Sequence, residues 1–185
     1  MKPALHPLED ERLRELRRYG ILDTDKEREF DELVAIASEI CEAPVSVINF
    51  IDDGRQWFKA EVGLGVRSTP LETSLCGHAI LQGDYIEIPD RLADARMADN
   101  PLCSSDPGFR FYAGSVLKGA NGLPLGTLCV LDHKPRELSE HQRRVLRVLS
   151  RHIMRELDLR LALDQEQTLR REVDHRVKNS LASIG

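Results

Sequence analysis

The sequence predicts an α+β fold, in which a central antiparallel sheet is flanked by helices and followed by a long C-terminal helix. Short β-branched segments are joined by tight-turn residues, which favours hairpin-linked strands. Segments with helical periodicity stand at the two ends of the chain rather than between successive strands. From residue 139 to residue 184 there is neither Pro nor Gly, so one continuous helix can form.

Two helices are predicted before the first strand. Residues 9–19 are mostly charged, with Leu13 and Leu16 as apolar positions, and Gly20 is suited to end the helix. Residues 27–41 carry apolar side chains at the spacing of one helical face. These side chains are Phe30, Leu33, Val34, Ile36, Ala37 and Ile40.

Five strands follow from runs of β-branched and apolar residues. The first two are joined by Asp52-Asp53-Gly54, and the last two by Gly119-Ala120-Asn121-Gly122. A short helix is expected at residues 74–81, and irregular chain at 63–73 and 94–108. The predicted strands cover residues 45–51, 55–62, 84–88, 110–118 and 125–131.

Composition narrows the class of protein. A chain of 185 residues with 41% hydrophobic and 31% charged residues suits one globular domain with an extension. The net charge of −5 argues against general binding to nucleic acid or to an anionic membrane. No apolar run has the length of a membrane span, and the N-terminus lacks the apolar centre of a signal peptide. We therefore expect a cytoplasmic protein whose cysteines are free thiols.

The order of motifs resembles the GAF domain family over roughly residues 5–150. The resemblance is carried by ILDT with Phe30-Asp31, INFIDDGRQWFKAEVGL, TSLCGHAI, IPDRLADARMADNPL, RFYAGSVL and GTLCVLDHKPREL. It is similar to the GAF domains that precede bacterial signalling modules. This likeness implies a sensory domain that binds a small molecule or transmits a conformational change.

A ligand pocket is expected from aromatic residues combined with a few polar groups. The alternative is that the aromatic rings fill the core and that Arg110 only pairs with a carboxylate. The identity of the ligand is unknown. The candidate pocket residues are Trp57, Phe58, Cys76, His78, Arg110, Phe111 and Tyr112.

The four cysteines permit two other interpretations. Cys76 with His78, or Cys129 with His133, offers thiolate and imidazole, but the spacing matches no structural zinc pattern, so no metal is expected. A thiol-based redox sensor using Cys76, Cys103 or Cys129 is a second alternative, as is a methionine sulfoxide reductase, an activity of some GAF proteins.

His175 is the sharpest candidate for chemistry. Phosphoryl transfer to histidine needs an accessible imidazole with a carboxylate beside it, which Asp174 can supply. Arg176 and Lys178 can hold a transferred phosphoryl group, and Asn179 lies one turn along on the same side. Spacing alone favours an ordinary solvent-exposed histidine on a charged helix.

The segment His175-Arg176-Val177-Lys178-Asn179 resembles the phosphoacceptor box of the HWE and HisKA_2 sensor histidine kinases. The likeness implies phosphorylation of His175 with ATP and Mg²⁺, then transfer to an aspartate of a response regulator. No glycine-rich ATP site is present in these residues, so we expect them to accept phosphate without catalysing its transfer. No cofactor is expected within the 185 residues themselves, and we expect them to come from a longer protein.

Apolar residues run along the predicted C-terminal helix at steps of four positions, with one step of eight, so the apolar stripe drifts round the helix axis. We expect the first part to pack on the sheet or on a partner, and the last part to form a parallel homodimer. The stripe consists of Leu149, Ile153, Leu157, Leu161, Leu169, Val173, Val177 and Leu181. The predicted units are therefore a GAF domain (1–150), a linker helix (151–170) and the start of a phosphoacceptor helix (171–185). The alternative is a ligand-binding or dimerisation module without catalytic function.

Overall fold

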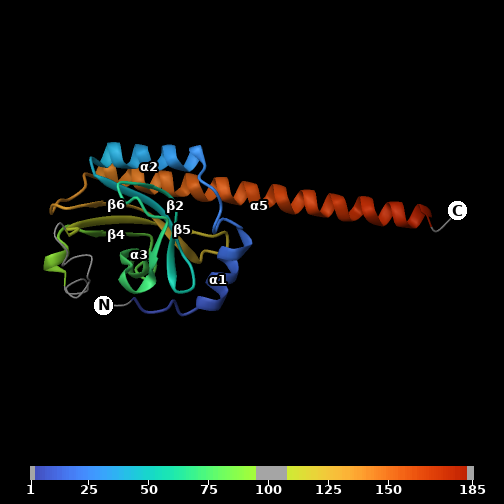
Figure 1. The fold of residues 1–185 in the computed structure, drawn as a ribbon, viewed down its shortest axis with the longest axis horizontal. Coiled ribbons are helices and arrows are strands. Elements are labelled where there is room, and N and C mark those ends of the chain that lie inside the picture. The colour runs from blue at the N-terminus through green and yellow to red at the C-terminus, as the bar shows by residue number, and fades with distance from the viewer. Residues whose placement is uncertain (1–2, 95–107, 183–185) are drawn as a thin grey trace.

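A six-stranded antiparallel sheet forms the centre of the protein, of which the computed structural model describes residues 3–94 and 108–182. The strand order is β3-β2-β1-β6-β5-β4, so the two hairpins meet where β1 pairs with β6 (Figure 1). The strands are β1 (Val45–Ile51), β2 (Arg55–Val62), β3 (Ser68–Pro70), β4 (Tyr85–Ile88), β5 (Phe111–Lys118) and β6 (Pro124–Asp132).

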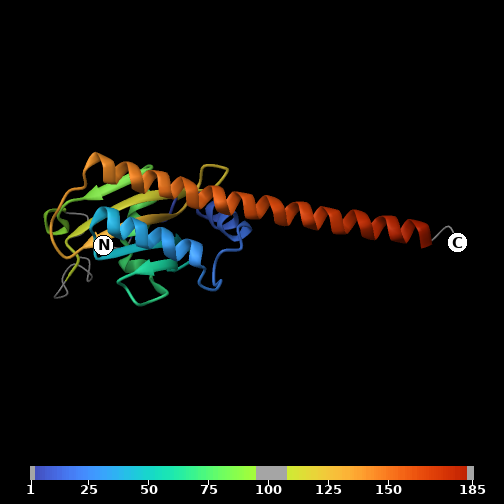
Figure 2. The ribbon, with the colours of Figure 1, turned by 90° about the horizontal axis from the view of Figure 1, so that it is seen from above.

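Helices cover both faces of this sheet unequally. One face carries α2 (Arg28–Cys41) beside the first half of α5 (Glu140–Ala182), and the other carries the short α3 (Leu75–Ala79) (Figures 1 and 2). Helix α1 (Glu9–Arg18) lies at one end of the sheet, and single 3-10 turns occur at Leu71–Thr73 and Arg91–Ala93. The predicted α+β fold is confirmed.

A β-bulge in β2 shapes the centre of the sheet. The pairs Ile48–Ala60 and Asn49–Phe58 leave Lys59 without a partner on β1. The side chain of Lys59 is buried on the helical face, where its ammonium donates to Thr24 Oγ1 (2.8 Å), Asp25 O (2.7 Å) and Glu27 Oε1 (2.5 Å). All three donors are satisfied, which is the condition for burying a charge.

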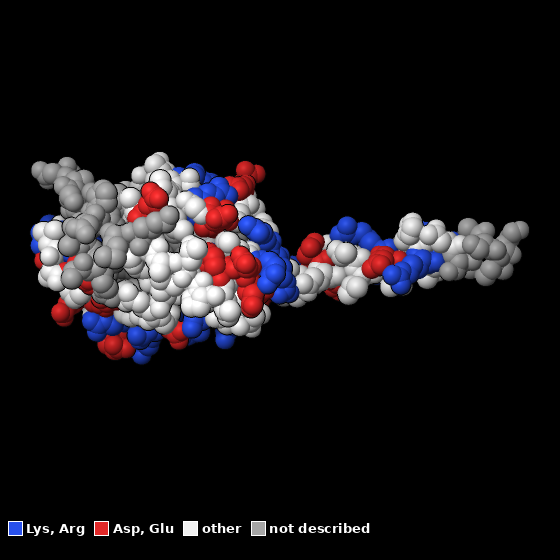
Figure 3. Space-filling view, turned by 90° about the horizontal axis from the view of Figure 1, so that it is seen from below, with Lys and Arg blue, Asp and Glu red and all other residues white. Residues whose placement is uncertain are grey.

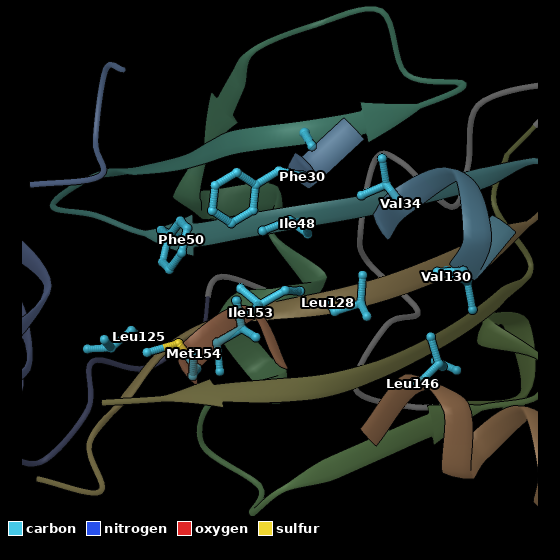
Figure 4. Packing of buried hydrophobic residues seen from close by; sticks show 14 of the residues in the cluster. Phe30, Val34, Ile48, Phe50, Leu125, Leu128, Val130, Leu146, Ile153 and Met154 are labelled. Carbon is cyan, nitrogen blue, oxygen red and sulfur yellow. The ribbon is translucent and has the colours of Figure 1, made fainter. Parts of the chain in front are cut away.

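The main hydrophobic core lies between the sheet and helices α2 and α5. Figure 4 shows side chains from four elements meeting there: Phe30 and Val34 from α2, Ile48 and Phe50 from β1, Leu128 and Val130 from β6, and Leu146, Ile153 and Met154 from α5. The core therefore fixes α5 to the domain over its first five turns, since Leu157 is the last buried residue within positions 140–179 of this helix.

Helix α5 begins at a reciprocal cap. Ser139 Oγ accepts from Gln142 N (3.2 Å), and Gln142 Oε1 accepts from Ser139 N (2.9 Å), which is the capping-box arrangement. Its 43 residues give a length of about 65 Å, and the second half projects from the domain (Figure 2). Within the described part of the chain, no helix combines the length and apolar character needed to cross a bilayer.

Candidate functional site

A cavity of about 190 Å³ lies on the α3 face of the sheet. It is mostly apolar with a few polar groups, as expected of a small-molecule site. Its volume is below the 300–1,000 Å³ that is typical of drug-sized ligands. The lining includes Val47, Gln56, Phe58, Leu64, Val66, Leu75, Cys76, Phe109, Tyr112, Cys129 and Leu131.

Two thiols line the cavity, and a buried amide donates to one of them. Cys76 Sγ on α3 lies 3.7 Å from Cys129 Sγ on β6. Asn49 on β1 donates through Nδ2 to Cys76 Sγ (3.2 Å) and to Thr127 Oγ1 (2.7 Å). Tyr112 on β5 donates its hydroxyl to Cys76 Sγ (3.3 Å). Three strands and one helix therefore converge on a single sulfur atom.

The positions of Cys76 and Tyr112 have local causes. Ser74 caps α3 by accepting from Gly77 N (2.9 Å), and its hydroxyl also donates to Gln56 on β2, which ties the helix to the sheet. The Tyr112 ring lies over Gly114, where a Cβ atom would overlap the Tyr112 hydroxyl. Glycine at this position thus lets the hydroxyl reach the thiols.

The surrounding hydrogen bonds distinguish the two thiols. Burial raises the pKa of Cys76, but hydrogen bonds from Cys129, Thr127, Tyr112 and Asn49 outweigh burial and lower the pKa to about 7. The hydrogen bond to Cys76, together with burial, raises the pKa of Cys129 well above its usual value. Burial and the nearby negative charge on Cys76 raise the pKa of Tyr112. Cys76 is therefore the thiol that ionises first.

The structure separates the predicted pocket residues. Phe58, Cys76 and Tyr112 line the cavity, whereas Trp57 and Phe111 lie in the core on the helical face. The reason is that successive side chains of a strand point to opposite faces, so Trp57 and Phe58 cannot share one pocket. Their neighbours are consistent with this: the Trp57 ring stacks on Phe50 (6.5 Å between centroids).

The remaining two predicted pocket residues lie outside the lining of this cavity. Arg110 forms two hydrogen bonds to the carboxylate of Asp90 (2.9 and 2.6 Å), as the ion-pair alternative expects. His78 is half-buried on α3. Cys103 is outside the described residues.

The predicted pocket does not include Asn49, Thr127 and Cys129. In the structure Cys129 lines the cavity, and Asn49 joins Cys76 to Thr127 by hydrogen bonds. A polar Asn within an otherwise apolar strand was the available signal for Asn49. The described residues contain no group of three or more His, Cys, Asp and Glu side chains able to hold a metal ion.

A second candidate site lies on the projecting half of α5. His175 is exposed, and its Nδ1 lies 3.3 Å from Asn179 Nδ2, one turn along the helix. Arg176 pairs with Glu172 (2.8 Å), and Asp174 and Lys178, which precede and follow His175 in the sequence, are exposed. The helix thus presents the imidazole to solvent. Figure 3 shows that Lys and Arg alternate with Asp and Glu along the projecting half of α5.

The apolar side chains of this half of α5 form a face of their own. Five of them are between 48% and 63% exposed: Leu159, Leu163, Leu169, Val173 and Val177. At 100° per residue they fall within a sector about 120° wide, and His175 lies on the opposite side of the helix. The expected division of the stripe is therefore seen, with Ile153 and Leu157 in the core and Val173 and Val177 exposed.

A larger depression of about 350 Å³ lies between β5 and α5. Its lining is charged, with Asp84, Lys118, Arg147, Arg151, Arg155 and Asp158 around the buried Ser150. It contains none of the residues predicted for the ligand pocket.

The comparisons with known proteins identify the domain. The profile of the GAF domain family matches residues 25–157, which is most of the chain. The chain belongs to the GAF domain family. The fold agrees with this membership, because the sheet, α2, α3 and the first part of α5 all fall within the matched range.

One curated relative shares enough sequence to compare with this GAF protein directly. A cyclic di-GMP phosphodiesterase of Pseudomonas aeruginosa is 39% identical over 149 residues, which are 79% of this chain but 25% of the relative. The chain thus spans about a quarter of the length of that protein.

Two solved structures show the same fold at low sequence identity. The blue-light-absorbing form of the PixJ GAF domain from Thermosynechococcus elongatus has a TM-score of 0.61, with 22% identity over 84% of this chain and 94% of that chain. A domain described as belonging to a two-component sensor histidine kinase of Sinorhizobium meliloti has a TM-score of 0.57, with 11% identity over 76% and 97% of the respective chains.

Proposed function

We propose that this GAF domain is the sensory part of a histidine kinase, and that His175 on α5 accepts the phosphoryl group. The observation that carries the proposal is the position of His175. It is exposed on the projecting half of α5, opposite the apolar face and beside Asn179. A phosphoacceptor has to be reached by both an ATP-binding domain and a receiver domain, and this position leaves it open to both.

The neighbouring amide supports a nucleophilic imidazole. Asn179 Nδ2 donates to Nδ1 of His175 (3.3 Å), which holds the imidazole ring in place and leaves Nε2 facing solvent. Nε2 would attack the γ-phosphorus of ATP in line, ADP would leave, and Asp174 would take up the imidazole proton. ATP and Mg²⁺ are supplied from outside the 185 residues, and the reaction requires a cytoplasmic location.

The apolar face of α5 supports a parallel homodimer. In a dimer built through Leu159, Leu163, Leu169, Val173 and Val177, this face would be buried between the two helices. His175 would then lie on the outer surface of each helix. A response regulator would receive the phosphoryl group there.

The test is labelling with γ-³²P-ATP after the matching ATP-binding domain is supplied in the same chain or in trans. We expect an acid-labile phosphohistidine at His175, and His175→Gln should abolish it with an unchanged circular dichroism spectrum. The matched controls are His141→Gln and His152→Gln, which alter exposed histidines of the same helix and should leave labelling unchanged. Full labelling of the His175→Gln protein would exclude this assignment.

A second candidate function is ligand binding by the α3-side cavity without any kinase activity. The volume of about 190 Å³ favours a small ligand. Mass spectrometry of molecules that co-purify with the protein tests this function. A ligand bound by a protein whose His175 cannot be labelled would favour the second candidate.

A further inference from the structure

The cavity contains a pair of thiols at a distance that suits a covalent reaction. Cys76 Sγ and Cys129 Sγ are 3.7 Å apart, and both residues are buried, with 3% and 1% of their surface exposed. A disulfide bond is about 2.05 Å long, so the sulfur atoms need to approach by about 1.7 Å.

The two cysteines differ in how firmly the fold holds them. Cys129 lies in β6, which is paired on both sides by β1 and β5. Cys76 lies on α3, a helix of five residues outside the sheet. The approach of the sulfur atoms can therefore come from a movement of α3 while the sheet stays in place.

The surroundings favour a reactive Cys76. Asn49 Nδ2 and the Tyr112 hydroxyl both donate to its sulfur (3.2 and 3.3 Å), which stabilises a thiolate. Cys41 is a useful contrast, since it lies in the core on the other face of the sheet. Burial raises the pKa of Cys41 to about 11, so Cys41 stays protonated.

A small reagent has a route to the thiols. Both cysteines line the cavity of about 190 Å³, and the exposed Val66 lies at its rim. The rest of the lining is largely apolar, with Val47, Phe58 and Leu131 among its residues. Such a space admits a small neutral molecule more readily than a charged one.

We propose that Cys76 and Cys129 form a redox-active dithiol that reduces hydroperoxides entering the cavity and closes as an intramolecular disulfide. This inference is independent of the role of His175.

The reaction has two steps. The Cys76 thiolate attacks the terminal oxygen of the hydroperoxide ROOH, the O–O bond breaks, and the alkoxide takes a proton and leaves as ROH. Cys76 becomes a sulfenic acid. The sulfur of Cys129 then attacks that of Cys76, the S–S bond forms, and the hydroxyl group leaves with the Cys129 proton as water. In total, two thiols lose two protons and two electrons, and ROOH is reduced to ROH and water.

The experiment uses the full 185-residue chain, as the wild type and as Cys103→Ser. Reduced protein is treated with a tenfold excess of hydrogen peroxide or cumene hydroperoxide, unfolded, alkylated and mapped by mass spectrometry. We expect a disulfide between Cys76 and Cys129 in both proteins and its full reversal by dithiothreitol. Before alkylation, the mass of the oxidised protein should be lower than that of the reduced protein by about two hydrogen atoms per disulfide formed.

Four variants separate the two steps. Cys129→Ser should stop at the sulfenic acid, so that dimedone labels Cys76, whereas Cys76→Ser should leave Cys129 unlabelled. Tyr112→Phe removes one donor and should slow disulfide formation several-fold. Cys41→Ser is the matched control and should react like the wild type.

Three results would overturn the proposal. The first is that Cys76 and Cys129 both remain alkylatable after the peroxide treatment. The second is oxidation of Cys41 as fast as Cys76. The third is a disulfide that joins Cys103 instead of Cys129 in the wild type. Peptide mapping of the wild type decides these outcomes even if a variant fails to fold.

Discussion

Replacing Trp57 by Ala tests whether this ring belongs to the core or to a pocket. Trp57 is 3% exposed and stacks on Phe50, with the Arg67 guanidinium 5.5 Å from its ring centre. Loss of a buried Trp side chain costs about 3–5 kcal/mol, and loss of a stacked aromatic partner contributes about 0.5–1.5 kcal/mol. We expect the free energy of unfolding to fall by about 4 kcal/mol, and the Tm by roughly 8–16 °C.

Urea unfolding followed by far-UV circular dichroism measures this change, because the variant lacks the only Trp of the chain and hence its fluorescence. The slope of free energy against urea concentration should stay the same. Leu92→Ala, at a side chain that is 58% exposed, is the control and should cost less than about 1 kcal/mol. A Trp57→Ala protein of nearly unchanged stability would contradict the packing argument, and weaker ligand binding in that protein would make Trp57 a pocket wall.

Two further predictions concern pH and assembly. Burial raises the pKa of Glu87, but hydrogen bonds from Arg143, Tyr85 and Leu138 N outweigh burial and hold it below the usual 4.5. A carboxyl group with a lowered folded-state pKa stabilises the fold above its unfolded pKa, and this contribution is lost as the pH falls through the folded pKa. The unfolding free energy should therefore decrease as the pH falls below about 4.5, and it should decrease less steeply in the Glu87→Gln variant. Denaturant titrations at several pH values measure this. Identical slopes of unfolding free energy against pH in the two proteins would argue against this role. For assembly, the double variant Val173→Glu, Val177→Glu should have a self-association constant at least about tenfold lower than that of the wild type in sedimentation equilibrium. The control, His175→Gln, should associate like the wild type. Equal association constants for the double variant and the wild type would rule out this dimer face.

Much of the fold follows from local sequence. The hairpin of β1 and β2 is predictable because Gly54 supplies the positive φ (72°) that its turn requires. Strand β3 was missed, because its three residues end in Pro and are largely exposed, so only pairing with β2 defines it. The division of α5 into a core-packed half and a projecting half was also predictable, from the drift of its apolar stripe.

The candidate pocket was predicted less well, for two different reasons. The separation of Trp57 from Phe58, and of Phe111 from Tyr112, follows from strand alternation and could have been recognised in the sequence. The approach of Cys76 to Cys129 could not, since the two are 53 positions apart and their distance depends on how α3 lies over the sheet. The contact of Asn49 with both sulfur atoms likewise requires the register of β1 against β6.

The continuity of α5 has a mechanical consequence. The helix contains neither Pro nor Gly from the core residue Leu146 to His175, so it offers no hinge to absorb a movement. A rotation of its packed half about the axis would turn the imidazole through the same angle. One residue inserted between Leu157 and His175 would turn the imidazole about the helix axis by about 100°. Four inserted residues would turn it by about 40°, and seven by about 20° in the opposite sense. The number of residues between Leu157 and His175 thus sets the direction in which the imidazole points, whatever side chains those residues carry.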